Sequence, residues 1–190
     1  PQRRLGRGAQ KGQRRVFFVD AAHFVLGAFL GMIWCFRRLF IRTSSGRQRY
    51  NVLGAVETLD HEMVTVRTTE SINAQTICQL VRNIDEKYPG EPITLVLDNA
   101  RYQRNRQVTE LAAELGIELL YLPTYSPNLN LIERVWKLVK SKCLRNRYYE
   151  DFGEFRGAID SFLDSLNGSN KILLESLLTE KFHIPIIPKT

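Results

Sequence analysis

The sequence predicts an α/β fold: a mixed five-stranded sheet with helices on both faces and extra C-terminal helices. Three observations predict it. Short apolar runs rich in strand-forming residues recur along the chain, two of them are joined by a tight turn, and the later ones alternate with segments of helical periodicity. The resulting order is β-β-β-α-β-α-β-α, followed by further helices. Three antiparallel strands that lead into βα units give a mixed sheet.

The first three strands lie in the N-terminal part of the chain. Residues 16–20 form an apolar run that ends in a carboxylate, which is typical of a buried strand. Residues 51–57 and 63–67 are two further strands. Residues 59–62 join them as a hairpin turn.

Two βα units follow the hairpin. Residues 72–88 have apolar side chains at helical spacing and stop at a Pro-Gly pair. The strand at 93–97 is apolar throughout, so we expect both of its faces to be covered. A helix at 104–115, closed by a glycine, then leads to the fifth strand at 117–121.

The C-terminal part is helical, with predicted helices at 131–144, 152–166 and 172–182. The segment 21–49 has no clear assignment, although 34–41 is a candidate for an additional strand. The order of elements as a whole is that of a ribonuclease H-like fold.

Charge is unevenly distributed over the 190 residues. The net charge is +7, and six of these charges lie in residues 1–15, which contain no acid. We therefore divide the chain into a basic linker or tail at 1–15, a core at 16–150, and a helical extension of the same domain at 151–190. The leader is either a solvated linker or a segment that binds a polyanion. The chain begins at Pro1, and we expect it to be part of a larger protein.

The cysteines and the apolar stretches indicate in which cellular compartment the protein is expected. Three cysteines, an odd number with wide spacing, favour a reducing cytosolic environment over a disulfide framework or a zinc site (Cys35, Cys78 and Cys143). Residues 16–36 are apolar, but Asp20 and His23 interrupt them. The remaining stretch of 13 residues is shorter than the about 20 that span a membrane.

Two carboxylates stand at the ends of predicted buried strands. Asp20 ends the first strand and Asp98 follows the fourth. A single acid at such a place ordinarily caps a loop or helix. In this topology, however, the two strands are neighbours. Two like charges at the edge of a core then favour a bound cation.

Glu133 is a third candidate acid, in the first turn of the helix that begins near residue 131. One interpretation is a capping box in which Asn130 is the N-cap and Glu133 stands three residues later. The other is that Glu133 points into the pocket that holds Asp20 and Asp98. The local pattern allows both.

Residues 96–100 (VLDNA) and 122–133 (LPTYSPNLNLIE) resemble the hallmark motifs of DDE transposases, and in particular the mariner-like group of bacterial insertion sequences. Asp98 and Glu133 have 34 residues between them, which is the spacing of that group. Asp20 matches the family's first acid. The chain departs from the pattern at Gln103, which stands where many relatives have a histidine. We also expect the family's N-terminal helix-turn-helix region to lie outside this chain.

The resemblance implies metal-dependent DNA cleavage and strand transfer at transposon ends. It implies two Mg²⁺ or Mn²⁺ ions, with Asp20 bridging both and Asp98 and Glu133 each holding one. The implied partner is double-stranded DNA, both the transposon ends and the target, and the chain is expected to bind it as a homodimer. The resemblance also implies a location in the bacterial cytoplasm, at the nucleoid, and no membrane partner.

Several other residues flank these acids. His23 is either a hydrogen-bonded residue at the core edge or a proton-transfer group, and we expect Asn99 to orient Asp98 or to cap the next helix. Trp136 is expected to pack in the core. Basic residues near the acids are either a solvated face or phosphate contacts (Arg14, Arg15, Arg101, Arg104, Arg106, Arg134, Lys137 and Lys140).

Two rival functions remain open. One is a ribonuclease H-like nuclease that acts on RNA–DNA hybrids or junctions. The other is a decayed relative that binds DNA without cutting it. Substrate preference and metal-dependent nicking distinguish these possibilities.

Overall fold

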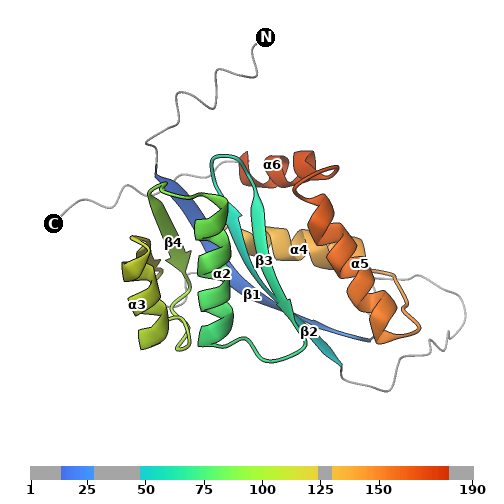
Figure 1. Ribbon diagram of the computed structural model, residues 1–190. Helices are drawn as coiled ribbons and strands as arrows, with labels where there is room; N and C mark the ends of the chain where they lie inside the picture. The colour runs from blue at the N-terminus through green and yellow to red at the C-terminus, as the bar shows by residue number, and fades with distance from the viewer. Residues whose placement is uncertain (1–13, 28–47, 124–129, 180–190) are drawn as a thin grey trace, which may run out of the picture.

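A five-stranded mixed sheet forms the centre of the molecule, in the order β3-β2-β1-β4-β5 (Figure 1). The computed structural model describes residues 14–27, 48–123 and 130–179. β2 pairs antiparallel with β1 and β3, and β4 pairs parallel with β1 and β5, so the predicted mixed sheet is confirmed. The strands are β1 (Arg15–Val25), β2 (Arg49–Glu57), β3 (Met63–Thr68), β4 (Ile93–Leu97) and β5 (Glu118–Tyr121).

The first strand is longer than predicted. It does not end at Asp20 but continues to Val25, paired with β2 from Phe17 opposite Glu57 to Val25 opposite Arg49. Buried and accessible residues alternate beyond Asp20, as in a strand with one covered face. Asp20 therefore lies inside a strand, and the prediction failed because it took the first charge as the strand's end.

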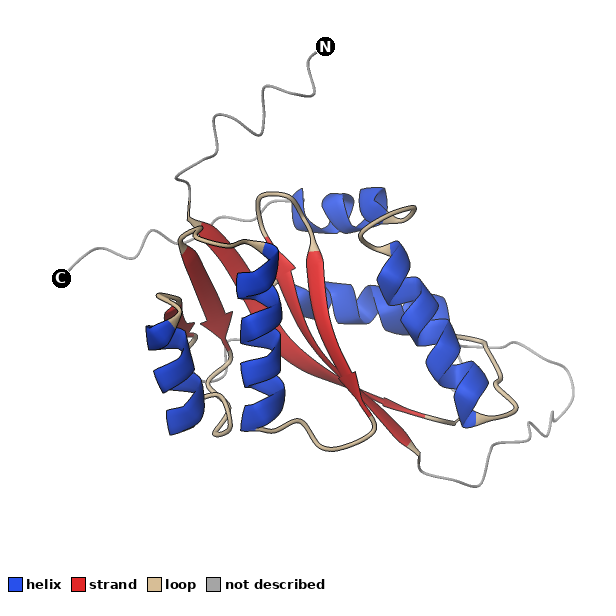
Figure 2. Cartoon of the chain, in the orientation of Figure 1, coloured by secondary structure: helices blue, strands red, loops and turns tan. Residues whose placement is uncertain are grey.

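Helices cover both faces of the sheet (Figure 2). α2 and α3 lie on one face, and α4, α5 and α6 lie on the other. α5 and α6 share one hydrophobic cluster with α4 and the sheet. The helices are α2 (Ala74–Lys87), α3 (Arg106–Glu114), α4 (Ile132–Cys143), α5 (Phe152–Ser165) and α6 (Lys171–Thr179).

Alternate side chains of β1 belong to two different cores. Phe17 and Val19 pack with α2 and α3, whereas Phe18, Ala22 and Phe24 pack with α4 and the helices that follow it. By this alternation Asp20 lies on the face of α4. The strand thus directs the Asp20 carboxylate towards the helix that carries Glu133.

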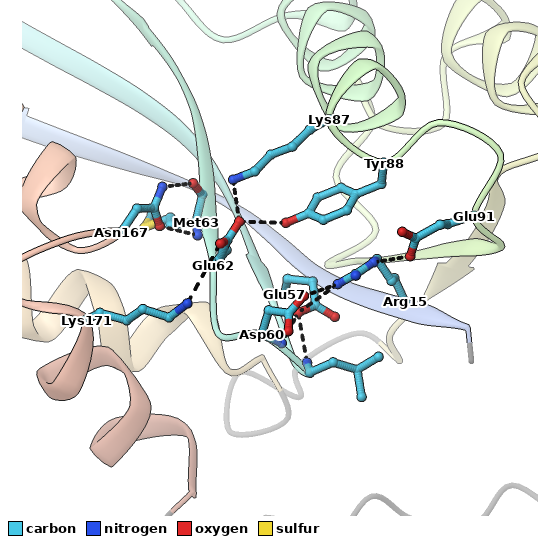
Figure 3. A network of polar contacts seen from close by, with 11 residues as sticks. Arg15, Glu57, Asp60, Glu62, Met63, Lys87, Tyr88, Glu91, Asn167 and Lys171 are labelled. Carbon is cyan, nitrogen blue, oxygen red and sulfur yellow. Dashed lines mark hydrogen bonds and ion pairs between the residues drawn. The ribbon is translucent and has the colours of Figure 1, made fainter. Parts of the chain in front are cut away.

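A network of charged side chains closes the end of the sheet where β1 begins (Figure 3). The Arg15 side chain is 12% exposed and is paired with Glu91, with Asp60 at 2.8 Å and with the fully buried Glu57 at 3.6 Å. Burial raises the pKa of the Glu57 carboxyl, and two backbone N–H groups and the charge of Arg15 oppose that rise. Nearby, Glu62 binds Lys87 at 2.6 Å.

Arg15 therefore does not belong to a basic tail. Its guanidinium is held by three carboxylates at the start of β1, which corrects the prediction that it contacts DNA. Arg14 is also tied to the sheet, because it donates to Thr94 at 3.1 Å and to Glu118 at 2.5 Å.

Two cysteines, Cys78 and Cys143, are buried free thiols. Burial raises the pKa of both thiols. The candidate strand at 34–41 lies outside the described residues. Within the described ranges, no helix is long and apolar enough to cross a membrane.

Candidate active site

Asp20 and Asp98 lie at the same level of the sheet. The parallel register pairs Phe18 with Val96. When this register is continued by two residues, Asp20 lies level with Asp98, which directly follows β4. Asp20 is half-buried and Asp98 is exposed. The two neighbouring strands thus bring these acids together, as the sequence predicts.

The electrostatics connect Asp20 to both other acids. Its pKa is raised from 3.8 to about 6, chiefly by burial and then by the negative charges of Asp98 and Glu133. Hydrogen bonds from the Ala21 backbone and from Trp136 act in the opposite direction. Both Asp98 and Glu133 are therefore close enough to Asp20 to disfavour its charged form.

Trp136 makes a polar contact that the sequence analysis missed. Its indole Nε1 donates a hydrogen bond to Oδ2 of Asp20 at 3.1 Å, and the residue is only 4% exposed. The ring also packs edge-on against Phe24, with centroids 6.3 Å apart, so the expected packing role holds as well. A usable signal was present, because a buried indole N–H needs an acceptor and Trp136 follows Glu133 by three residues on one helix face.

The start of α4 differs from the predicted capping box. The N-cap is Leu131, which makes no side-chain capping bond. Asn130 is buried, and its Nδ2 donates to the Val19 carbonyl of β1 at 3.2 Å. The capping interpretation of Asn130 and Glu133 is therefore wrong, because Asn130 ties the helix to the sheet instead. The predicted Tyr125-Ser126-Pro127 segment lies outside the described residues.

The loop after β4 also corrects a prediction. Asn99 has a φ of 76°, and its side chain accepts a hydrogen bond from Arg104. The cap of α3 is Asn105, and Asp98 accepts from the backbone of Ala100 at 3.3 Å. Asn99 therefore neither orients the Asp98 carboxylate nor caps the helix.

His23 lies on the wrong face for proton transfer at Asp20. Because β1 continues as a strand, a residue three positions later faces the opposite side of the sheet. Its Nδ1 lies 2.6 Å from Oδ1 of Asn51, the residue opposite it on β2. The alternative interpretation, a hydrogen-bonded histidine at the core edge, fits this contact.

Two residues near Asp98 were given no role from the sequence: Tyr102, which was not singled out, and Gln103, which was noted only as a departure from the family pattern. Burial and the charges of Asp98 and Asp20 raise the pKa of Tyr102 to about 12. Gln103 is fully buried, and its Oε1 accepts from the Ala100 backbone at 3.1 Å. Gln103 therefore stabilises the turn that presents Asp98. The position of Gln103, five residues after Asp98 at the end of β4, was the sequence feature that could have indicated this role.

The predicted basic residues divide into two groups. Arg104 stacks on Tyr121 at 4.7 Å, Arg106 pairs with Glu110 at 2.7 Å, and Arg134 donates to the Leu177 carbonyl at 3.0 Å. Arg134 thus holds α6 against α4. The second group is Arg101, Lys137 and Lys140, whose side chains make no hydrogen bond or ion pair within the described part of the chain. Arg101 and Lys137 are exposed, and Lys140 is half-buried.

The donor set suits a hard divalent cation. Asp20, Asp98 and Glu133 offer only carboxylate oxygens, the ligand type of Mg²⁺. A cation would relieve the repulsion that adds to burial in raising the pKa of Asp20. Across residues 14–27, 48–123 and 130–179, no three acidic, histidine or cysteine side chains form a ready-made metal cluster. The three acids therefore fit the cation chemically. In the structure, the negative charges of Asp98 and Glu133 each act on Asp20.

This sheet and its acids correspond to a known family. Residues 15–156 match the model of the DDE superfamily endonucleases, and the chain belongs to that family. It is 23% identical over 155 residues to the insertion element IS630 uncharacterized 39 kDa protein of Shigella sonnei, covering 80% of this chain and 45% of the relative.

A second relative is the uncharacterized protein y4pE/y4sA of Sinorhizobium fredii (strain NBRC 101917 / NGR234). It is 30% identical over 78 residues, which cover 41% of this chain and 53% of the relative. The chain spans about half the length of the curated relatives it matches.

Solved structures share the fold. The Mos1 transposase paired-end complex with left transposon end has a TM-score of 0.61 at 14% identity, covering 93% of this chain and 59% of that one. The HTLV-2 integrase catalytic core domain in complex with magnesium has a TM-score of 0.52 at 15% identity, covering 80% and 83%. The fold is therefore the ribonuclease H-like fold of transposase and integrase cores, and both the fold prediction and the family resemblance are confirmed.

Proposed function

We propose that this chain is the catalytic part of a transposase that cuts DNA at transposon ends and joins the 3′ ends to target DNA. The observation that carries the proposal is the placement of three carboxylates. Asp20 lies in β1 on the face covered by α4, Asp98 directly follows the neighbouring strand β4, and Glu133 lies in the first turn of α4. Family membership supports the same chemistry. Among the structural neighbours are a Mos1 mariner complex with Mn and an integrase core with magnesium.

Asp20, Asp98 and Glu133 are the residues that would hold Mg²⁺ or Mn²⁺ in two sites, with Asp20 shared. Bound divalent cations supply an activated oxygen nucleophile and neutralise charge on the leaving oxygen. Asp20 supplies a half-buried carboxylate fixed on one side by the Trp136 N–H. Asp98, exposed beyond β4, is accessible to a DNA backbone.

Phosphate contacts are assigned to Arg101, Lys137 and Lys140. Lys137 and Lys140 follow Glu133 by four and seven positions on α4, which sets them on its face of the helix. Each phosphate contact adds about one unit to the salt dependence of DNA affinity. Binding as a homodimer on double-stranded DNA, and the division into a core at 16–150 with a helical extension at 151–190, are parts of the same proposal.

The test is cleavage of a plasmid that carries candidate transposon ends, with Mg²⁺, with Mn²⁺ and with EDTA. We expect wild-type protein to nick it only with a divalent cation, and Asp98→Asn to abolish nicking. Glu110→Gln is the matched control, because it removes an exposed acid of α3 outside the site. Loss of activity in both variants, or none in either, would reject the assignment, and preferential cleavage of an RNA–DNA hybrid would favour the ribonuclease alternative.

A further inference from the structure

The indole of Trp136 occupies a space that only glycine leaves open. Gly54 stands directly opposite Asp20 in the antiparallel pairing of β1 and β2. A Cβ added at Gly54 would lie 2.7 Å from Cη2 and 2.8 Å from Cζ2 of the Trp136 ring, and 2.8 Å from Cε of Met63. The end of the Met63 side chain is flexible and can shift, whereas the ring of Trp136 is rigid. Real Cβ atoms do not approach so closely, so the missing side chain at Gly54 is a condition for the ring's position beside Asp20.

The same indole connects two of the proposed ligands. Its N–H binds Oδ2 of Asp20 at 3.1 Å, and residues three apart on a helix are neighbours, so Glu133 lies one turn away on the same face of α4. The contact to Oδ2, together with the hydrogen bond that the carboxylate accepts from the Ala21 backbone, restricts the rotation of the carboxylate group. Asn130, which donates to the Val19 carbonyl, anchors the start of the same helix to the neighbouring residue of β1.

We propose that Trp136 is a positioning residue. Its indole, which fits in the space left by Gly54, sets the orientation of the Asp20 carboxylate and the separation between Asp20 and Glu133. This inference rests on the proposed function, because it assigns a role in building the cation site. The alternative is that Trp136 only fills the core. Packing alone does not explain why the buried N–H ends on the carboxylate of Asp20.

Trp136→Phe removes the N–H and keeps an aromatic ring. We expect the variant to fold and to need about tenfold more Mg²⁺ for half-maximal thermal stabilisation, the lower end of the range for residues that orient metal ligands. Its cleavage rate at saturating Mg²⁺ should fall less than its rate at low Mg²⁺. The matched control is Val139→Ala, which makes a cavity at a fully buried position of the same helix and core without touching a polar contact.

Gly54→Ala is the second variant, because it displaces the ring without changing any ligand. We expect it to raise the Mg²⁺ requirement in the same direction as Trp136→Phe. The inference is overturned if Trp136→Phe leaves the Mg²⁺ midpoint unchanged, or if Val139→Ala shifts it as much.

A spectroscopic reading separates this inference from the proposed function. The chain has two tryptophans, so Trp136→Phe assigns the indole N–H proton resonance of Trp136. We expect Asp20→Ala to shift that resonance upfield, and an unmoved resonance would reject the contact. If wild-type protein shows no response to Mg²⁺ while the resonance does shift, the proposed function fails and the contact with Asp20 stands.

Discussion

Replacing Asp20 by Asn is expected to stabilise the protein at neutral pH in the presence of EDTA. In the folded state burial and the charges of Asp98 and Glu133 raise the pKa of Asp20 from 3.8 to about 6. A rise in the pKa from 3.8 to about 6 corresponds to about 3 kcal/mol of unfavourable free energy when the carboxylate is ionised. Asn is the same size, carries no charge and keeps an oxygen to accept the Trp136 N–H.

The sign of the pH dependence follows from the direction of the shift. Below pH 3.8 the carboxyl is protonated in both folded and unfolded states, so it contributes no difference. As the pH rises from about 4 to about 6 the unfolded chain loses this proton first, and the wild-type protein loses stability relative to Asp20→Asn. Above about pH 6 the gap is constant, and we expect 1–3 kcal/mol after allowance for partial solvent screening.

Urea unfolding of both proteins, followed by circular dichroism between pH 4 and pH 8 in EDTA, measures this gap. Adding Mg²⁺ should raise the stability of wild-type protein and close the gap, because a ligand that binds only the folded state stabilises it. If Asp20→Asn were less stable than wild type by the same amount at every pH, Asp20 would be a structural residue and the reasoning would be refuted.

Three further variants test the roles assigned to Glu133, Lys137 and Arg15. Glu133→Gln should abolish Mg²⁺-dependent nicking while it changes the free energy of unfolding by less than about 1 kcal/mol, because no capping bond is lost; a large loss of stability in a melting curve would contradict this. Lys137→Ala should weaken DNA binding and lower the slope of log affinity against log salt by about one unit, whereas an unchanged slope would leave Lys137 as a solvated residue. Arg15→Met should lower the free energy of unfolding in urea by about 3 kcal/mol, because it leaves the buried Glu57 unpaired. It should not change the slope of log DNA affinity against log salt, whereas loss of a DNA-binding arginine would lower that slope.

The pairing of Asp20 with Asp98 could be predicted from sequence because it depends on strand order. Each acid follows an apolar run, and neighbouring parallel strands bring residues at the same register together. The exact end of β1 could not be predicted, because an acid in the middle of a strand looks locally like its end. Of the two interpretations left open for His23, the continued strand fits the hydrogen-bonded residue at the core edge, since the direction of a side chain reverses at every residue of a strand.

The contacts around Trp136 depend on residues far apart in the chain. Gly54 reads locally as an ordinary residue of a strand, and its role appears only when α4 crosses β1 and β2. Asn130 likewise matches the capping pattern by spacing alone, whereas its amide is used by the Val19 carbonyl, 111 residues away in sequence. Such tertiary contacts compete with local patterns and cannot be read from them.

A crystal structure of the full chain soaked with Mn²⁺, with anomalous data collected, shows whether Asp20, Asp98 and Glu133 together hold the cation. We expect anomalous density between Asp20, Asp98 and Glu133, with carboxylate oxygens of all three at about 2.1–2.2 Å from the ions, close to the distance of a small hard cation. In the same map Oδ2 of Asp20 should keep its hydrogen bond to Trp136. Anomalous density elsewhere, or bound Mn²⁺ that leaves Asp20 uncoordinated, would show that these three acids do not form the cation site.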